Sequence, residues 1–152
     1  EVKTAKEDLD TLVCNYAITL NKQQKTQEAF DYVLKVIDTF GTSDQLQRTL
    51  DNAVYNSAVN MLNDYKDDEA FSYFESNKEY MSPAMAQKTE KMISSQILKN
   101  KEIEIHNQVV PLFNAGEYIK VKEILEEALK ENPSSLMLKK DLQLVNKALG
   151  LK

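Results

Sequence analysis

Three stretches of this sequence superimpose without gaps, and their spacing constrains the fold more than any other feature. They are CNYAITLN (14–21), YNSAVNML (55–62) and HNQVVPLF (106–113). Each has Asn in second place, a small or β-branched residue in fourth place and a β-branched residue in fifth. Twelve residues after the fourth place comes another small or β-branched residue, which is Ala29, Ala70 or Val121. Antiparallel helices pack closely only where small side chains lie at their crossing, so the pattern predicts helical hairpins.

The shortage of helix breakers also predicts a helical protein, because the 152 residues include only three Gly and three Pro. No segment alternates at period two for long enough to form a strand, so the predicted fold class is all-α. Leu12, Tyr16 and Phe71 are expected to face the core, together with the small residues of each hairpin. Ser43, Ser82-Pro83 and Ser134 are the expected starts of three helices. Helices are expected over 4–22, 28–40, 44–63, 67–80, 117–131 and 134–149, with 83–115 forming one helix bent near Pro111 or two helices that part around Asn100.

The three units share a longer register of large and small residues. The first unit has Val13, Tyr16, Ala17, Leu20, Ala29 and Val33; the second has Val54, Ser57, Ala58, Met61, Ala70, Phe74 and Pro83; the third has Ile105, Val109, Leu112, Gly116, Tyr118, Val121, Leu125, Ala128 and Pro133. This register resembles the tetratricopeptide repeat (TPR) over most of residues 10–149.

The resemblance implies a right-handed superhelix of stacked helical hairpins, a TPR-like solenoid of about seven helices. It implies one domain over 1–152, with units at about 10–41, 51–83 and 102–133 and a capping helix at 134–149. The spacing departs from the family, since Ala29 and Ala70 are 41 residues apart and Ala70 and Val121 are 51 apart. Ordinary units recur about every 34 residues. A generic helical bundle is the alternative.

Charge and cysteine content exclude some classes of function. The net charge is −5 with both signs interleaved, which argues against nucleic acid as a partner. Cys14 is the only cysteine, so an intrachain disulfide is excluded and the redox compartment is left open. The sequence contains no run of about 18 apolar residues, so no transmembrane segment is predicted. A soluble chain is expected, with the cytoplasm slightly favoured, although an upstream signal or anchor stays open because the first residue is Glu1.

No catalytic constellation is visible, so the chain is not expected to be an enzyme. The single Cys and the single His are far apart in sequence, and no Gly-rich phosphate loop or zinc-ligand cluster is present. No cofactor or metal is expected. Cys14 is interpreted as a small packing residue. His106 holds the equivalent place in the third unit and is expected on its ligand-facing side.

Asn15, Asn56 and Asn107 hold the same place in the three units. The TPR resemblance implies that this place lines a concave groove, where an Asn amide can bind the backbone of a peptide through both donors and an acceptor. The expected binding residues are Asn15, Ile18, Tyr55, Asn56, Val59, Asn63, His106, Asn107, Val110 and Asn114. The alternative is that each Asn bonds to the adjacent helix or is simply part of the family pattern.

The sequence therefore predicts a non-catalytic scaffold that binds a peptide or a partner protein in a TPR groove. One alternative is a structural module that self-associates through its long first helices, and another is the TPR segment of a larger protein. A homodimer would use the stripe of Met85, Met92, Ile93 and Ile97, whereas packing of this stripe within the chain is the competing interpretation.

Overall fold

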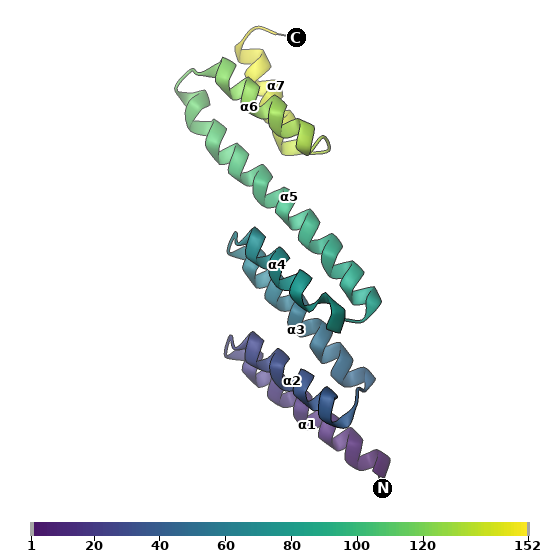
Figure 1. Cartoon of the computed structure of the whole chain (residues 1–152). Helices are drawn as coiled ribbons and strands as arrows, with labels where there is room; N and C mark the ends of the chain where they lie inside the picture. Colours follow the sequence, from purple (N-terminus) through teal and green to yellow (C-terminus); the bar gives the residue numbers. More distant parts are fainter. Residues whose placement is uncertain (1, 152) are drawn as a thin grey trace. The chain divides into compact units, whose positions relative to one another are not determined.

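The computed structural model describes residues 2–151 of the chain, with side chains described for 5–151. These residues form helices and connecting turns without any strand, which confirms the all-α prediction (Figure 1). The α-helices are α1 (Val2–Lys22), α2 (Thr26–Phe40), α3 (Asp44–Asn63), α4 (Asp67–Asn77), α5 (Pro83–Asn114), α6 (Tyr118–Glu131) and α7 (Leu136–Ala148), and η1 (Lys78–Tyr80) is a short 3-10 helix. Contacts within the chain separate it into two compact units, Glu1–Ser94 and Ser95–Lys152. The single solenoid domain stays a prediction.

The first unit contains two helical hairpins, α1–α2 and α3–α4. The two helices of each hairpin pack against each other, and α3 also packs against both α1 and α2. Ala17 and Ala29 in the first hairpin and Ala58 and Ala70 in the second are each at most 1 % exposed. Small buried side chains in paired helices are what close helix packing requires, as the sequence pattern predicted. Larger buried residues, such as Val33 and Phe74, complete the core around them.

The same turn joins the two helices of each hairpin in the chain. The residue two places before the start of each second helix takes a left-handed backbone: Gln24 has φ 61°, Tyr65 has φ 59° and Gly116 has φ 80°. Two hydrogen bonds recur around it, for example from Tyr65 N to Leu62 O and from Lys66 N to Met61 O. This pair of bonds is a Schellman motif, which satisfies carbonyl groups at a helix end. The three turns are 41 and 51 residues apart, like the small residues of the sequence pattern.

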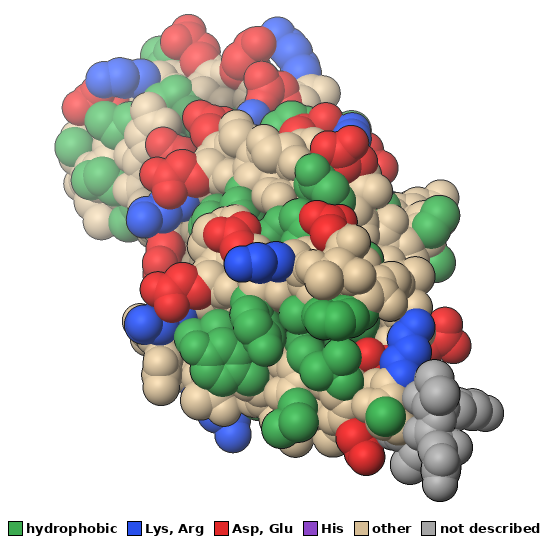
Figure 2. All heavy atoms as spheres, turned by 60° about the horizontal axis from the view of Figure 1, so that its bottom comes forward, with side chains coloured by type: hydrophobic (Ala, Val, Ile, Leu, Met, Phe, Trp, Pro, Cys, Tyr) green, Lys and Arg blue, Asp and Glu red, His purple; other side chains and the backbone are tan. Residues whose placement is uncertain are grey.

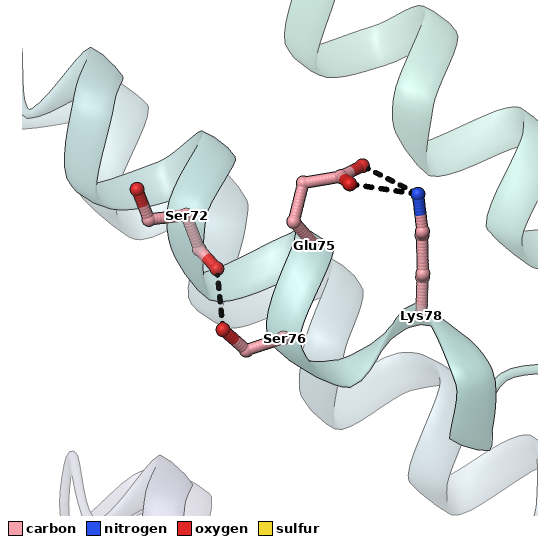
Figure 3. A network of polar contacts seen from close by, with 4 residues as sticks. All are labelled: Ser72, Glu75, Ser76 and Lys78. Atoms are coloured by element: carbon pink, nitrogen blue, oxygen red, sulfur yellow. Dashed lines mark hydrogen bonds and ion pairs between the residues drawn. The ribbon is translucent and has the colours of Figure 1, made fainter.

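Side-chain hydrogen bonds mark the end of α4. The Ser76 hydroxyl donates to the Ser72 carbonyl at 2.9 Å, and Lys78 Nζ donates to both carboxylate oxygens of Glu75 at 2.8 and 2.7 Å (Figure 3). The Glu75 carboxylate raises the pKa of the exposed Lys78 above its ordinary value. Asn77 Nδ2 donates to the Tyr73 carbonyl at 2.7 Å. These side-chain bonds lie in the last turns of α4, just before it passes into η1.

A buried carboxylate holds the chain where η1 gives way to α5. Asp51 on α3 is buried, and it accepts hydrogen bonds from Ser82 N at 2.8 Å and from Ser82 Oγ at 2.6 Å. Gln47 Nε2 donates to the same Asp51 at 3.1 Å and to the Tyr80 carbonyl at 2.9 Å. Charge-assisted bonds of this kind offset the cost of burying the carboxylate. Pro83 follows at the first position of α5, which confirms the expected helix start.

The second unit packs the last part of α5 against α6 and α7. Its core residues are Val109, Val121, Leu125, Leu138 and Val145. The start of α7 corrects the sequence prediction: Ser135, not Ser134, is the N-cap and accepts a hydrogen bond from Leu138 N at 3.0 Å. Ser134 instead donates to Asn132 Oδ1 at 3.1 Å, so its hydroxyl is engaged in the preceding turn. Ser43 caps α3 as predicted, by accepting from Leu46 N at 3.2 Å.

Ser135 makes the same kind of contact as Ser82, because each serine binds a carboxylate of an earlier helix. Its hydroxyl donates to a carboxylate oxygen of Glu102 on α5. Glu102 lies 51 residues after Asp51, so both carboxylates occupy the same place in their units. In each unit a carboxylate on one helix binds the serine at the start of a later helix. The sequence pattern did not single out this pair of contacts.

α5 runs as one helix from Pro83 to Asn114 and contains Pro111, which settles the choice left open between one helix and two. Residues 95–114 correspond in length and register to α3 (44–63), because the repeat spacing here is 51 residues. Residues 83–94 are turns of α5 that have no counterpart in α3. They belong to the first unit and explain why the second spacing is longer than the first.

Three residues expected in the core are exposed. Leu12 is 68 % exposed, Tyr16 is 51 % exposed and Phe71 is 46 % exposed. α2 and α3 cover only part of the apolar stripe of α1, and Leu12 and Tyr16 lie in the part that stays uncovered. The predicted stripe was therefore correct for Val13, Ala17 and Leu20 but wrong at its edge.

Candidate partner-binding cleft

The ten residues expected to bind a partner all lie on the first helices of the hairpins. Asn15 and Ile18 are on α1; Tyr55, Asn56, Val59 and Asn63 are on α3; His106, Asn107, Val110 and Asn114 are on α5. The first six belong to the first unit and the last four to the second. Each group is therefore described within its own unit.

The three asparagines at equivalent places are exposed. Asn15, Asn56 and Asn107 make no side-chain hydrogen bond within the described part of the chain. Their amides therefore do not bond to an adjacent helix, which was one of the two alternatives for these residues. Each amide keeps both its donors and its acceptor available to an incoming group.

In the first unit the large apolar residues expected to bind a partner are only partly exposed. Ile18 is exposed, whereas Tyr55 and Val59 are half-buried. Lys88 Nζ lies 5.5 Å from the centre of the Tyr55 ring, a cation–π distance that covers part of the ring. This face therefore offers Asn15, Ile18 and Asn56 more freely than Tyr55.

Asn63 lies instead beside a polar cavity between the two hairpin turns of the first unit. The cavity has a volume of about 520 Å³, and Asn21 and Ser57 are among its lining residues. Ser57 Oγ and Asn21 Oδ1 are buried without a hydrogen-bond partner, as is the nearby Tyr73 hydroxyl. Burial raises the pKa of Tyr73; Ser57 partly offsets this, although the two hydroxyls make no hydrogen bond of ordinary geometry.

In the second unit, three of the expected residues line one cleft. His106, Val110 and Asn114 form its α5 wall, and the cleft has a volume of about 170 Å³. The other lining residues are Val109 and Phe113 on α5, Val121 on α6, and Asp141, Leu144 and Val145 on α7. Asn107 is exposed and does not line the cleft.

Helical spacing explains the α5 wall. Val109 and Val110 come three and four residues after His106, and Phe113 comes four and three residues after them, so the four share one face of the helix. The Phe113 ring packs edge-on against Tyr118, with centroids 5.0 Å apart, and this contact fixes Phe113 at the end of the hairpin.

α7 supplies the opposite wall, which sequence reasoning missed because this helix was expected only to cap the array. Leu144 and Val145 come three and four residues after Asp141, so the three share a face of the helix. His106 Nδ1 and Asp141 Oδ2 are 2.7 Å apart and join α5 to α7. An ionised Asp141 can only accept a hydrogen bond, so Nδ1 is the donor and Nε2 is left for another partner.

The chemistry of the cleft suits an apolar side chain. Valine, leucine and phenylalanine form most of its surface, with the His106–Asp141 pair and Asn114 as its polar groups. Sites for drug-sized ligands occupy about 300–1,000 Å³. A cleft of about 170 Å³ is smaller and fits one anchoring side chain of a larger partner.

The structure also describes the surroundings of Cys14 and the chemistry that the remaining residues could support. Cys14 is buried, and its Sγ lies 3.0 Å from Thr49 Oγ1, in agreement with a packing role. In the part of the chain that the structure describes, no cluster of three His, Cys, Asp or Glu side chains could hold a metal ion. Among the same residues, no helix combines the length and apolarity needed to cross a membrane.

The stripe proposed for homodimerisation is not an exposed surface. Ile93 is only 1 % exposed, and Met85, Met92 and Ile97 are half-buried. Ile93 therefore packs within the chain, as the competing interpretation expected.

Comparison with known proteins adds no relative to this geometry. No protein-family model matches the chain, and neither the curated proteins nor the solved structures searched contain a match to it.

Proposed function

We propose that this protein is a non-catalytic scaffold that binds a partner protein or peptide, with the second-unit cleft as the main anchor site. The partner inserts one apolar side chain between α5 and α7. The single observation that carries the proposal is that His106, Val110 and Asn114, chosen from the sequence as ligand-facing, line one cleft together.

The repeat arrangement supports the same proposal. We infer a TPR-like array, because the turns at Gln24, Tyr65 and Gly116 share their backbone geometry at the spacing of the sequence repeat. The TPR resemblance implies that the first helices of such an array line its concave binding surface. Each unit then offers exposed amides to backbone groups of a partner, Asn15 and Asn56 in the first and Asn107 in the second, and the cleft of the second unit selects for an apolar residue.

A peptide selection tests the proposal. Random dodecapeptides displayed on phage are selected against the 152-residue chain, and the most enriched peptide is titrated with ¹⁵N-labelled protein. We expect chemical-shift changes at His106, Val110 and Asn114. A selection that yields no peptide, or a peptide whose shifts lie elsewhere, contradicts the proposal.

Leu144 and Leu136 provide a matched pair of variants on α7. Both leucines are exposed, but only Leu144 lines the cleft. We expect Leu144→Lys to weaken binding of the selected peptide at least about tenfold, because the ammonium group replaces the apolar wall. Leu136→Lys adds the same charge to the same helix and leaves the affinity unchanged. Equal effects of the two variants would point to charge rather than to the cleft.

A further inference from the structure

The His106–Asp141 pair gives the second-unit cleft a polar group of defined chemistry. Hydrophobic side chains also gather over the first hairpin in Figure 2. Apolar contact is non-directional, so an apolar surface does not by itself select one ligand. The cleft differs because His106 and Asp141 line it together with its apolar walls, and a hydrogen-bonding group has a direction and a sign.

Asp141 determines which nitrogen of His106 carries the proton. His106 Nδ1 and Asp141 Oδ2 are 2.7 Å apart, and an ionised carboxylate can only accept, so the proton of the neutral ring lies on Nδ1. Nε2 of that ring holds a lone pair and can only accept a hydrogen bond. Within the described part of the chain, Nε2 has no hydrogen-bond partner. A ligand that satisfies this nitrogen must therefore bring a donor.

The polar groups of α5 stand at the two ends of its wall of the cleft. His106 and Asn114 are eight residues apart, which is about 12 Å along a helix axis. Val109, Val110 and Phe113 lie between them in the sequence and line the same cleft. A side chain that lies along this wall therefore has apolar surface beside it, an acceptor at one end and an amide at the other.

On the basis of the proposed function, we propose that the anchoring side chain is a tyrosine whose hydroxyl donates to His106 Nε2. Tyrosine carries a donor at the far tip of an apolar ring, whereas the indole N–H of tryptophan lies on the ring edge and phenylalanine has no donor. The ring packs against Val109 and Val110, and the partner's backbone lies towards the Asn114 amide. Asp141 is a positioning residue, because it acts on the ligand only through the tautomer of His106.

The ring nitrogens of His106 give a direct test, because it is the only histidine in the chain. A long-range ¹H–¹⁵N spectrum of the free protein at pH 8, which favours the neutral ring, should show a protonated Nδ1 and an unprotonated Nε2. Asp141→Ala removes the acceptor and should populate the ring protonated at Nε2. N-acetyl-tyrosine amide should shift the Nε2 signal of the unaltered protein, and N-acetyl-phenylalanine amide should not. A free protein with its proton on Nε2, or equal shifts with the two amides, overturns the proposal.

Affinities of the phage-selected dodecapeptides test recognition of the hydroxyl. We expect an enriched tyrosine, and its replacement by phenylalanine should weaken binding about fivefold, the effect of one ordinary hydrogen bond. The double variant His106→Phe/Asp141→Leu removes the acceptor without leaving a carboxylate unpaired, and it should bind both peptides equally. Gln108→Ala, at an exposed position of α5 outside the cleft, is the control and should keep the fivefold preference.

The outcomes separate this inference from the proposed function. A cleft-bound peptide that gains nothing from tyrosine over phenylalanine overturns the inference and leaves the proposed function intact. A selection without any cleft-binding peptide overturns both. Far-UV circular dichroism confirms that the double variant remains helical, and the tautomer of the unaltered protein decides the case if the double variant fails to fold.

Discussion

Gln24 and Tyr65 hold the same left-handed backbone conformation in equivalent turns, with φ of 61° and 59°. In the third turn the same place is taken by Gly116, with φ 80°. Left-handed geometry costs a residue with a Cβ about 1–2 kcal/mol, whereas Gly adopts it freely. The two hairpins of the first unit therefore close on strained residues and the third hairpin does not.

Replacing these strained residues with glycine should stabilise the protein. We expect Gln24→Gly and Tyr65→Gly each to raise the free energy of unfolding by up to about 1 kcal/mol, since both side chains are exposed and relief of strain outweighs the added chain entropy. Gly116→Ala should lower it by about 1 kcal/mol. Urea unfolding followed by circular dichroism measures all three. Lys22→Gly, at the last helical residue of α1, is the control and should destabilise.

The buried carboxylate of Asp51 should be sensitive to loss of its serine partner. Ser82→Ala removes the hydroxyl that donates to Asp51 Oδ2, and we expect a loss of about 1–3 kcal/mol in the free energy of unfolding. Ser76→Ala removes only an exposed bond to the Ser72 carbonyl and should change stability by less than about 0.5 kcal/mol. Thermal unfolding compares the two variants. Equal effects would show that the Asp51 contact contributes nothing particular.

Tyr73 should make the protein less stable at alkaline pH. Its pKa in the folded state is raised above the ordinary 10.0, mainly by burial, so the neutral hydroxyl is favoured in the fold. The stability linked to Tyr73 is therefore fully present below pH 10 and is lost as the pH rises through the folded-state pKa. Tyr73→Phe should reduce the alkaline loss seen in urea midpoints, whereas Tyr65→Phe, at an exposed position, should not.

The three asparagines should matter for binding and not for folding. The combined change of Asn15, Asn56 and Asn107 to Ala removes exposed amides without intrachain bonds and introduces a better helix former. We expect an unchanged or slightly higher melting temperature and a weaker complex with the selected peptide. If that complex keeps its affinity, the first helices are not the binding face.

Much of the fold could be predicted from local sequence signals. Ser43 and Pro83 mark helix starts through their own backbone chemistry, and the small residues Ala17, Ala29, Ala58 and Ala70 mark the packed faces. These signals depend on neighbours within one or two helical turns, which a single sequence displays directly.

Contacts between distant segments could not be predicted in the same way. His106 and Asp141 are 35 residues apart, and nothing in either local pattern indicates that α7 would form one wall of the cleft. Periodicity places Leu12 and Val13 on neighbouring parts of one stripe, but it does not show how much of that stripe another helix covers. Only the tertiary packing separates the buried residue from the exposed one.

The double role of α7 has a practical consequence. The helix contributes Leu138 and Val145 to the interior of its unit and Leu144 to the wall of the cleft. Cutting the chain before this helix would remove one wall of the cleft and two core residues in a single step. Deletion mapping would therefore assign binding to the C-terminal segment even if none of its residues contacted a partner. Only single substitutions on the solvent side of α7 distinguish direct contact with a partner from loss of core packing.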